Sequence, residues 1–167
     1  MARSRRTDLT IAAVALIVAV AAVVGALVVT SQRSTNGSPV SRGEAIFQSG
    51  TDANGNLIPR SSSGGGMMGG GGMMGGSGCA NCHGSDGHGR TTATFTSPNI
   101  TYGNLTDPQG MLMPDGTRGP VYTDASIRTA VTQGIDPQGS RLEAPMPQWQ
   151  LTGPEWSDLL AYLKTLK

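Results

Sequence analysis

Several kinds of residue that would point to common functions are scarce in this chain of 167 residues. Charged residues make up 14% and aromatic residues 4%, and lysine and arginine form no run that would bind nucleic acid. From residue 41 onward, eight arginines and lysines stand against ten aspartates and glutamates, so this part is about neutral to slightly acidic. The residues near the two cysteines include neither a pair of carboxylates nor a nucleophile with an adjacent base. We therefore expect neither nucleic-acid binding nor acid–base catalysis.

Residues that form loops are abundant instead, with 25 glycines and 10 prolines. Long stretches rich in Gly, Pro, Thr and Asp separate the few helical segments, which is more loop than a domain of this size normally supports around its own core. We infer that something other than side chains fills the centre of the domain.

The N-terminal residues predict a membrane anchor. Residues 9–30 carry no charge and, at about 1.5 Å per residue, are long enough to cross a hydrocarbon core of about 30 Å. Residues 1–8 hold three arginines and one aspartate, and this positive excess favours a cytoplasmic N-terminus. A cleaved secretory signal is the alternative, although the apolar run is longer than a signal core. We expect a linker over 31–40 and a folded domain over 41–167, outside the cytoplasm.

A short helix is expected at the start of this domain. Ser41 and Glu44 form a possible capping box, and the residues that follow place Gly43 and Phe47 one turn apart. Residues 50–58 then predict a small hairpin, because turn residues separate two extended pieces.

Two further helices are predicted later in the chain. One runs over 123–133 and ends at Gly134, with Ile127, Ala130 and Val131 on one face. The last has Thr152 as N-cap and Glu155 at the third position. It carries an apolar stripe of four leucines: Leu159, Leu160, Leu163 and Leu166.

Cys79 and Cys82 are followed directly by His83. Two thiols three positions apart reach the two vinyl groups on one edge of a haem, and the adjacent histidine is carried under the iron as a ligand. A thiol redox pair would need a βαβ framework that the sequence lacks, and zinc would need ligands beyond His88. A disulfide across so short a loop would be strained. The spacing therefore predicts covalent attachment of one haem c, with His83 as a ligand of its iron.

Residues 41–167 resemble a small single-haem cytochrome c of the His/Met type. The resemblance rests on Cys79–Gly84 near one end and on the Ala-Pro-Met-Pro-x-Trp motif at 144–149, followed by a Leu-x-x-Tyr helix, at the other. It implies an all-α fold, the small cytochrome c fold, with three to five helices around one covalently bound haem after the N-terminal transmembrane helix.

In this family the first helix of the domain crosses the last. Gly43 and Phe47 of the first helix would then meet Leu159 and Tyr162 of the last. The crossing is implied by the resemblance and not by the periodicity of either segment.

Met146 is the predicted second iron ligand. A thioether on the opposite face of the iron raises the haem potential and keeps the iron six-coordinate. Met146 lies between two prolines, which restrict the backbone, and just before the helix expected to close the haem pocket. Met111, Met113, His88 and an open site remain as alternatives.

Pro98 and Trp149 complete the predicted site. Pro98 resembles the family proline whose carbonyl accepts the Nδ1 proton of the ligating histidine and so fixes the ring. Trp149 is a candidate donor to a haem propionate, as are Tyr102 and Arg118, although a tryptophan near a cofactor is more often part of the core.

Residues 61–78 form a low-complexity segment with a repeated Gly-Gly-Met-Met unit directly before Cys79. A flexible linker is the simplest interpretation. The alternatives are the collection of Cu(I) by paired thioethers and hydrophobic docking to a partner.

These observations predict an electron-transfer protein and not an enzyme. It would carry one electron on haem iron between respiratory or photosynthetic partners at the extracytoplasmic surface of the cytoplasmic membrane. Two alternatives remain: a fixed haem subunit of a larger membrane oxidoreductase complex, and a ligand-binding haem protein with an open distal site.

Overall fold

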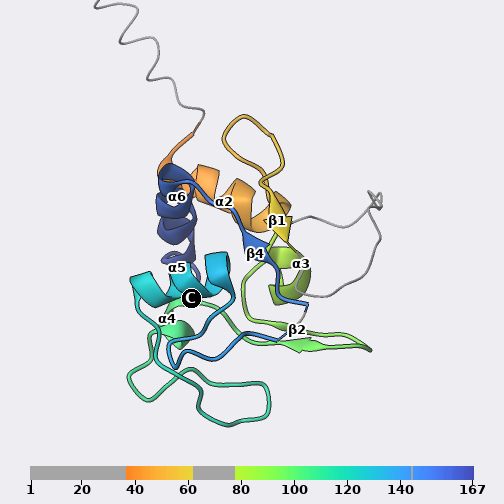
Figure 1. Cartoon of the computed structure of the whole chain (residues 1–167), viewed down its shortest axis with the longest axis vertical. Helices are drawn as coiled ribbons and strands as arrows, with labels where there is room; N and C mark the ends of the chain where they lie inside the picture. The colour runs from red at the N-terminus through yellow and green to blue at the C-terminus, as the bar shows by residue number, and fades with distance from the viewer. Residues whose placement is uncertain (1–36, 62–77, 144) are drawn as a thin grey trace, which may run out of the picture. The chain divides into compact units, whose positions relative to one another are not determined.

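The computed structural model of the chain describes residues 37–61, 78–143 and 145–167. In this part of the chain, helices are interspersed with short strands (Figure 1). Their order is α2 (Pro39–Ser49), β1 (Arg60–Ser61), α3 (Ala80–His83), β2 (Arg90–Thr91), β3 (Thr96–Ser97), α4 (Tyr102–Leu105), α5 (Asp124–Gln133), β4 (Gln148–Trp149) and α6 (Gly153–Leu163).

The predicted membrane span over 9–30 and most of the predicted linker over 31–40 lie outside the described residues. Among the residues that are described, no helix is both long and apolar enough to cross a membrane. Residues 62–77, which are nearly all of the Gly/Met segment, also lie outside the described ranges.

Helix α2 begins earlier than the sequence predicts. Ser38 is its N-cap and accepts a hydrogen bond from the Ser41 backbone N–H over 3.2 Å, while Pro39 occupies the first turn. Gly50 ends the helix in a left-handed conformation, with φ at 70°. The predicted capping box of Ser41 and Glu44 is therefore wrong, because a proline already suits the first turn of a helix and the upstream serine supplies the cap.

Helix α5 has the boundaries that the sequence predicts, and α6 begins where predicted but ends at Leu163, so that Leu166 of the predicted stripe lies beyond the helix. Thr123 caps α5 and Thr152 caps α6, each in a capping box with the residue three positions later. Gly134 ends α5 in a left-handed conformation. The buried residues of the two helices form their apolar faces: Ile127, Ala130 and Val131 on α5, and Trp156, Leu159, Tyr162 and Leu163 on α6.

Helices α2 and α6 meet at Gly43. A Cβ atom added to Gly43 would lie 1.9 Å from the backbone oxygen of Asp158, so only glycine allows this approach. One turn later, the Phe47 ring is completely buried and its centroid lies 5.3 Å from that of Tyr162. This separation is in the favourable range for aromatic pairs. The contacts of Gly43 and Phe47 with the last helix, expected from the resemblance, are thus present with Tyr162.

An ion pair that the sequence does not predict joins the same two helices. Arg42 donates from Nε and Nη2 to the two carboxylate oxygens of Asp158, each over 2.7 Å. Both side chains are mostly shielded from solvent, with 18% and 12% of their surfaces exposed. A two-pronged contact of this kind fixes orientation as well as distance, so it holds α2 in one rotation against α6.

The predicted all-α fold is wrong, because segments between the helices form two small antiparallel sheets. Strands β2 and β3 make a hairpin in which Arg90 lies opposite Ser97. Strand β1 pairs with β4, which is distant in sequence, and Arg60 lies opposite Trp149. Turn residues dominate these segments, but backbone N–H and C=O groups next to a packed core need partners, and short strands supply them.

Three further turns are closed by single antiparallel bridges. The pairing of Thr51 with Leu57 confirms the small hairpin predicted over 50–58. In each turn an aspartate carboxylate accepts backbone N–H groups from the residues that follow it. The other two bridges join Leu112 to Arg118 and Ile135 to Arg141.

Candidate cofactor-attachment site

One helical turn carries the three residues of the predicted attachment motif. The backbone N–H groups of Cys82 and His83 both donate to the carbonyl of Cys79, over 3.1 and 3.0 Å. Residues three and four positions apart share one face of a helix. Both cysteines are free thiols and both are half-buried. The local fold therefore places two thiols and one imidazole side by side on a short segment.

His83 is held in a defined orientation and protonation state. Its side chain is buried, and its Nδ1 lies 3.0 Å from the carbonyl oxygen of Pro98. A carbonyl only accepts, so Nδ1 carries the proton and the neutral ring has its lone pair on Nε2. Burial lowers the pKa of His83, and the bond to Pro98 opposes this only in part. At neutral pH the ring is thus uncharged with Nε2 available for a metal.

The contact between His83 and Pro98 is the one that the family resemblance implies. The loop that returns to Pro98 is closed by two short backbone bonds. Gly89 N–H donates to the His83 carbonyl over 2.8 Å, and Ile100 N–H donates to the Gly87 carbonyl over 2.7 Å. The carbonyl of Pro98 is therefore presented to the histidine by a hydrogen-bonded loop and not by apolar packing.

The environment of Cys79 differs from that of a reactive thiol. Burial raises the pKa of the Cys79 thiol to about 12, and the nearby charge of Arg60 opposes this shift only weakly. Redox-active cysteines have lowered pKa values, since the thiolate is the nucleophile. Within the described residues, no group of three or more His, Cys, Asp or Glu side chains is placed to hold a metal ion.

Trp149 belongs to the core, where 3% of its surface is exposed. The guanidinium of Arg60 lies 5.2 Å from the centre of its ring, on the strand paired with β4. The same guanidinium acts electrostatically on the Cys79 thiol. Arg60 therefore interacts both with Trp149 and with the first cysteine of the attachment turn. The predicted propionate contact of Trp149 stays a prediction.

The two alternative propionate donors have other partners in the structure. Tyr102 donates its hydroxyl to Asp124 over 2.8 Å. Arg118 donates to Asp107 over 3.0 Å. Both side chains are thus engaged within the protein itself.

The candidate distal ligands lie on separate segments. Met146 is half-buried in the turn that leads into β4, and its backbone N–H donates to the Glu143 carbonyl over 3.1 Å. Met111 is buried in the core, with 4% of its surface exposed. Ligation of iron by Met146 stays a prediction.

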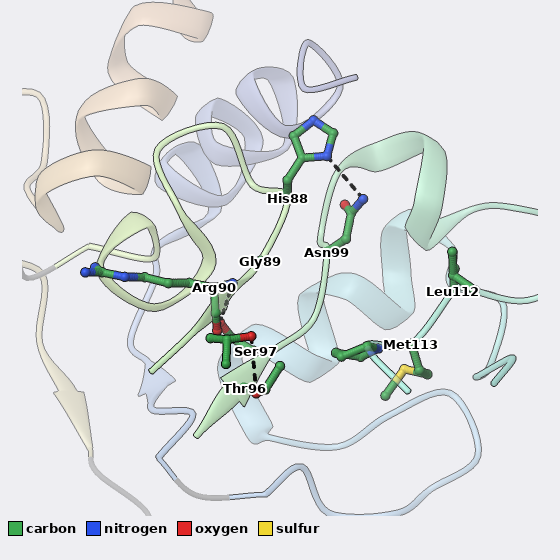
Figure 2. Close-up of a pocket in the computed structure, with 10 residues that line it drawn as sticks. His88, Gly89, Arg90, Thr96, Ser97, Asn99, Leu112 and Met113 are labelled. Carbon is green, nitrogen blue, oxygen red and sulfur yellow. Dashed lines mark hydrogen bonds between the residues drawn. The ribbon is translucent and has the colours of Figure 1, made fainter. Parts of the chain in front are cut away.

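The remaining alternatives, Met113 and His88, both line a cleft of about 350 Å³ beside the β2–β3 hairpin (Figure 2). His88 is exposed, and its Nδ1 lies 3.4 Å from the side-chain amide of Asn99. Figure 2 shows the Arg90 side chain extending away from Met113.

Two residues that shape the site were not among those predicted from the sequence. Ser97 is buried, and its hydroxyl contacts the carbonyls of Cys82 and Arg90. Gly89 has φ at 89°, and a Cβ atom there would lie 2.5 Å from the carbonyl oxygen of Ser97. The threonine-rich run at 91–96 is a strand signal that predicts the hairpin, but no local pattern identifies the contacts that it makes.

The residues present fit a covalently attached haem. Two free thiols on one helical turn match the two attachment points, and His83 has its unprotonated nitrogen free of hydrogen bonds within the described part of the chain. Cys79 and Cys82 would form the thioether links, and His83 would bind the iron. Comparison of this chain with protein-family models, with curated proteins and with solved structures finds no match.

Proposed function

We propose that this chain is an electron-transfer protein that carries one haem c, attached through Cys79 and Cys82. The observation that carries the proposal is the state of His83. Its ring is buried, Nδ1 is bound to the Pro98 carbonyl, and Nε2 makes no hydrogen bond to any described residue. A histidine that ligates a metal is normally fixed in this way through its second nitrogen.

The haem, once bound, supplies one-electron chemistry at its iron. The chain would contribute attachment through the two thiols of Cys79 and Cys82, an imidazole ligand from His83 and a thioether ligand from Met146. No substrate bond is made or broken, so the protein needs no acid–base groups at this site. The raised pKa of Cys79 supports this reading, because it disfavours a role in thiol exchange.

Residues 9–30 support a location at the cytoplasmic membrane, with the domain on the extracytoplasmic face. A single-pass anchor would confine the search for redox partners to the membrane surface and raise their effective concentration. The partners proposed are respiratory or photosynthetic redox proteins, either met by diffusion or held with this chain in a larger complex.

Covalent attachment is tested by expressing the full chain in a host that exports it and attaches haem. The wild type is expected to retain haem on a denaturing gel and to show the corresponding mass by mass spectrometry. Cys82→Ala should lose normal attachment, and His83→Ala should lose the low-spin spectrum. His88→Ala, which changes the other histidine of the same loop, is the matched control and should behave as wild type. A wild-type chain without covalent haem would refute the proposal.

The distal ligand is tested by comparing Met146→Ala with Met113→Ala. Met146→Ala should keep its haem but lose the weak long-wavelength Met-to-iron band, lower its potential and bind carbon monoxide when reduced. Met113→Ala should keep the wild-type spectrum. If Met146→Ala also keeps the wild-type spectrum, another side chain binds the iron and the assignment of Met146 as the distal ligand is wrong.

A further inference from the structure

We propose that Ser97 is a positioning residue for the iron-binding histidine. In this inference, which rests on the proposed function, the Ser97 hydroxyl ties the end of the attachment turn to the segment that carries the Pro98 carbonyl. The two segments then move as one unit, so the orientation of the His83 ring is set by a side chain whose hydrogen bonds go to the backbone of Cys82 and Arg90 and not to the ring.

The starting observation is the C-terminal end of α3. The last carbonyl groups of a helix have no partner within the helix. Here the returning loop supplies donors to two of these carbonyls. Gly89 N–H donates to the His83 carbonyl over 2.8 Å, and the Ser97 hydroxyl donates to the Cys82 carbonyl. Ser97 is therefore the side-chain cap of the short helix that carries the attachment motif.

Ser97 is also fixed from its own side of the contact. Its side chain is buried with 9% of its surface exposed, and its Oγ accepts the backbone N–H of Arg90 over 3.2 Å across the hairpin. Its Oγ lies 3.1 Å from the Arg90 carbonyl as well. Figure 2 shows Ser97 against the backbone of Arg90, with these contacts drawn. A hydroxyl held by both strands has little freedom to leave the Cys82 carbonyl.

Ser97 and Pro98, which are adjacent in the chain, thus contact Cys82 and His83, which are also adjacent. The Ser97 side chain binds Cys82, and the Pro98 carbonyl lies 3.0 Å from Nδ1 of His83. The proline ring restricts the backbone between the two contacts. Gly89 packs against the same segment so closely that a Cβ atom would lie 2.5 Å from the Ser97 carbonyl oxygen. The segment is therefore held on both sides.

The strength of the Nδ1–H contact affects the nitrogen that binds iron. Donation from Nδ1 to a carbonyl raises the basicity of Nε2, which favours the oxidised iron and lowers the reduction potential. Removing the Ser97 hydroxyl frees the Pro98 carbonyl to move, weakens this donation and raises the potential. A residue with a purely structural role would change stability without this signature at the histidine.

The test uses the full haem-loaded chain and compares Ser97→Ala with Ser97→Thr. Three quantities are measured: covalent haem content, reduction potential, and the exchange rate of the His83 Nδ1 proton by NMR. In Ser97→Ala the haem content should be unchanged, the proton should exchange about fivefold faster, and the potential should rise. Ser97→Thr restores a hydroxyl and should restore both values. Thr96→Ala removes an exposed hydroxyl from the same strand and should match wild type.

Two results would overturn the inference. One is a Ser97→Ala protein with wild-type exchange rate and potential. The other is a failure of Ser97→Thr to restore either value. If Ser97→Ala yields no folded protein, Pro98→Ala provides a second route, since it loosens the same carbonyl while keeping the hydroxyl. It should raise the exchange rate and the potential, and unchanged values would again overturn the inference.

Failure of the proposed function gives a different result. In that case the wild-type chain has no covalent haem, whereas the His83 Nδ1 proton is still protected in the haem-free chain and still exchanges faster in Ser97→Ala. The effect of the Ser97 and Pro98 contacts on the His83 ring is thereby measured independently of the haem.

Discussion

The crossing of α2 with α6 and the attachment loop over 78–100 are stabilised in different ways. The crossing buries large side chains, among them Phe47, Leu159 and Tyr162, around a direct backbone contact. The attachment loop buries no large apolar side chain, and its buried residues are Gly78, His83, Gly87 and Ser97. Its shape depends on hydrogen bonds and on glycines in conformations that other residues rarely adopt.

The two kinds of contact suit different structural roles. Apolar packing is strong but not directional, so it can hold two helices without fixing the angle of a single ring. Hydrogen bonds are weaker but directional, so the loop can fix the orientation of His83.

The largest effect is expected from Phe47→Ala at the helix crossing. The side chain is completely buried and pairs with Tyr162, so its removal should lower the free energy of unfolding by about 3–5 kcal/mol. Chemical denaturation followed by circular dichroism measures this loss. Leu57→Ala, at a side chain with 68% of its surface exposed, is the control and should change stability by less than about 0.5 kcal/mol. Equal losses would contradict the packing described for the crossing.

Gly43→Ala should destabilise the same crossing by about 3 kcal/mol, because the added Cβ overlaps the backbone oxygen of Asp158 and forces the helices apart. The matched control is Gly153→Ala at the start of α6, where a Cβ atom meets nothing within 4 Å. The same denaturation experiment compares the two. A tolerated alanine at Gly43 would mean that the two helices are not in backbone contact.

Gly89→Ala tests the attachment loop and should cost about 2 kcal/mol, of which about half is the strain of a left-handed residue. Gly116 has a similar φ, 84° against 89°, but open space around it. Gly116→Ala therefore measures the strain alone, at about 1 kcal/mol. The excess at Gly89 reports its close approach to the Ser97 carbonyl. Identical losses in the two variants would show that this approach is not limiting.

The smallest effect on stability is expected from substitution of a cysteine. Here the folded and unfolded chains should differ in the reactivity of the Cys79 thiol. In a haem-free Cys82→Ser chain, the alkylation rate of Cys79 should keep rising with pH toward about 12, because burial holds the thiol protonated. The urea-unfolded chain is the control and should level off near the ordinary value of 9.0. A folded-state profile that also levels off near 9.0 would show that Cys79 is not shielded.

Features set by neighbouring residues could be predicted from the sequence. The glycine that ends α5 and the capping residues of α6, Thr152 and Glu155, are local patterns, and so is the turn over 50–58. The attachment motif is also local, because its chemistry depends on a spacing of three residues. The contact of Pro98 with His83 was predictable only through the resemblance, since the fourteen residues between them must fold back to make it.

Features set by residues distant in sequence were decided by the tertiary structure. The pairing of β1 with β4, the ion pair of Arg42 with Asp158, and the hydroxyl of Ser97 on Cys82 have no local signal. The all-α prediction failed for the same reason: a two-residue strand exists only where another segment presents backbone partners. The sequence by itself thus determined which side chains are the candidates for attachment and ligation, whereas only the packed chain decided how His83 is held, because directional contacts require both partners in place.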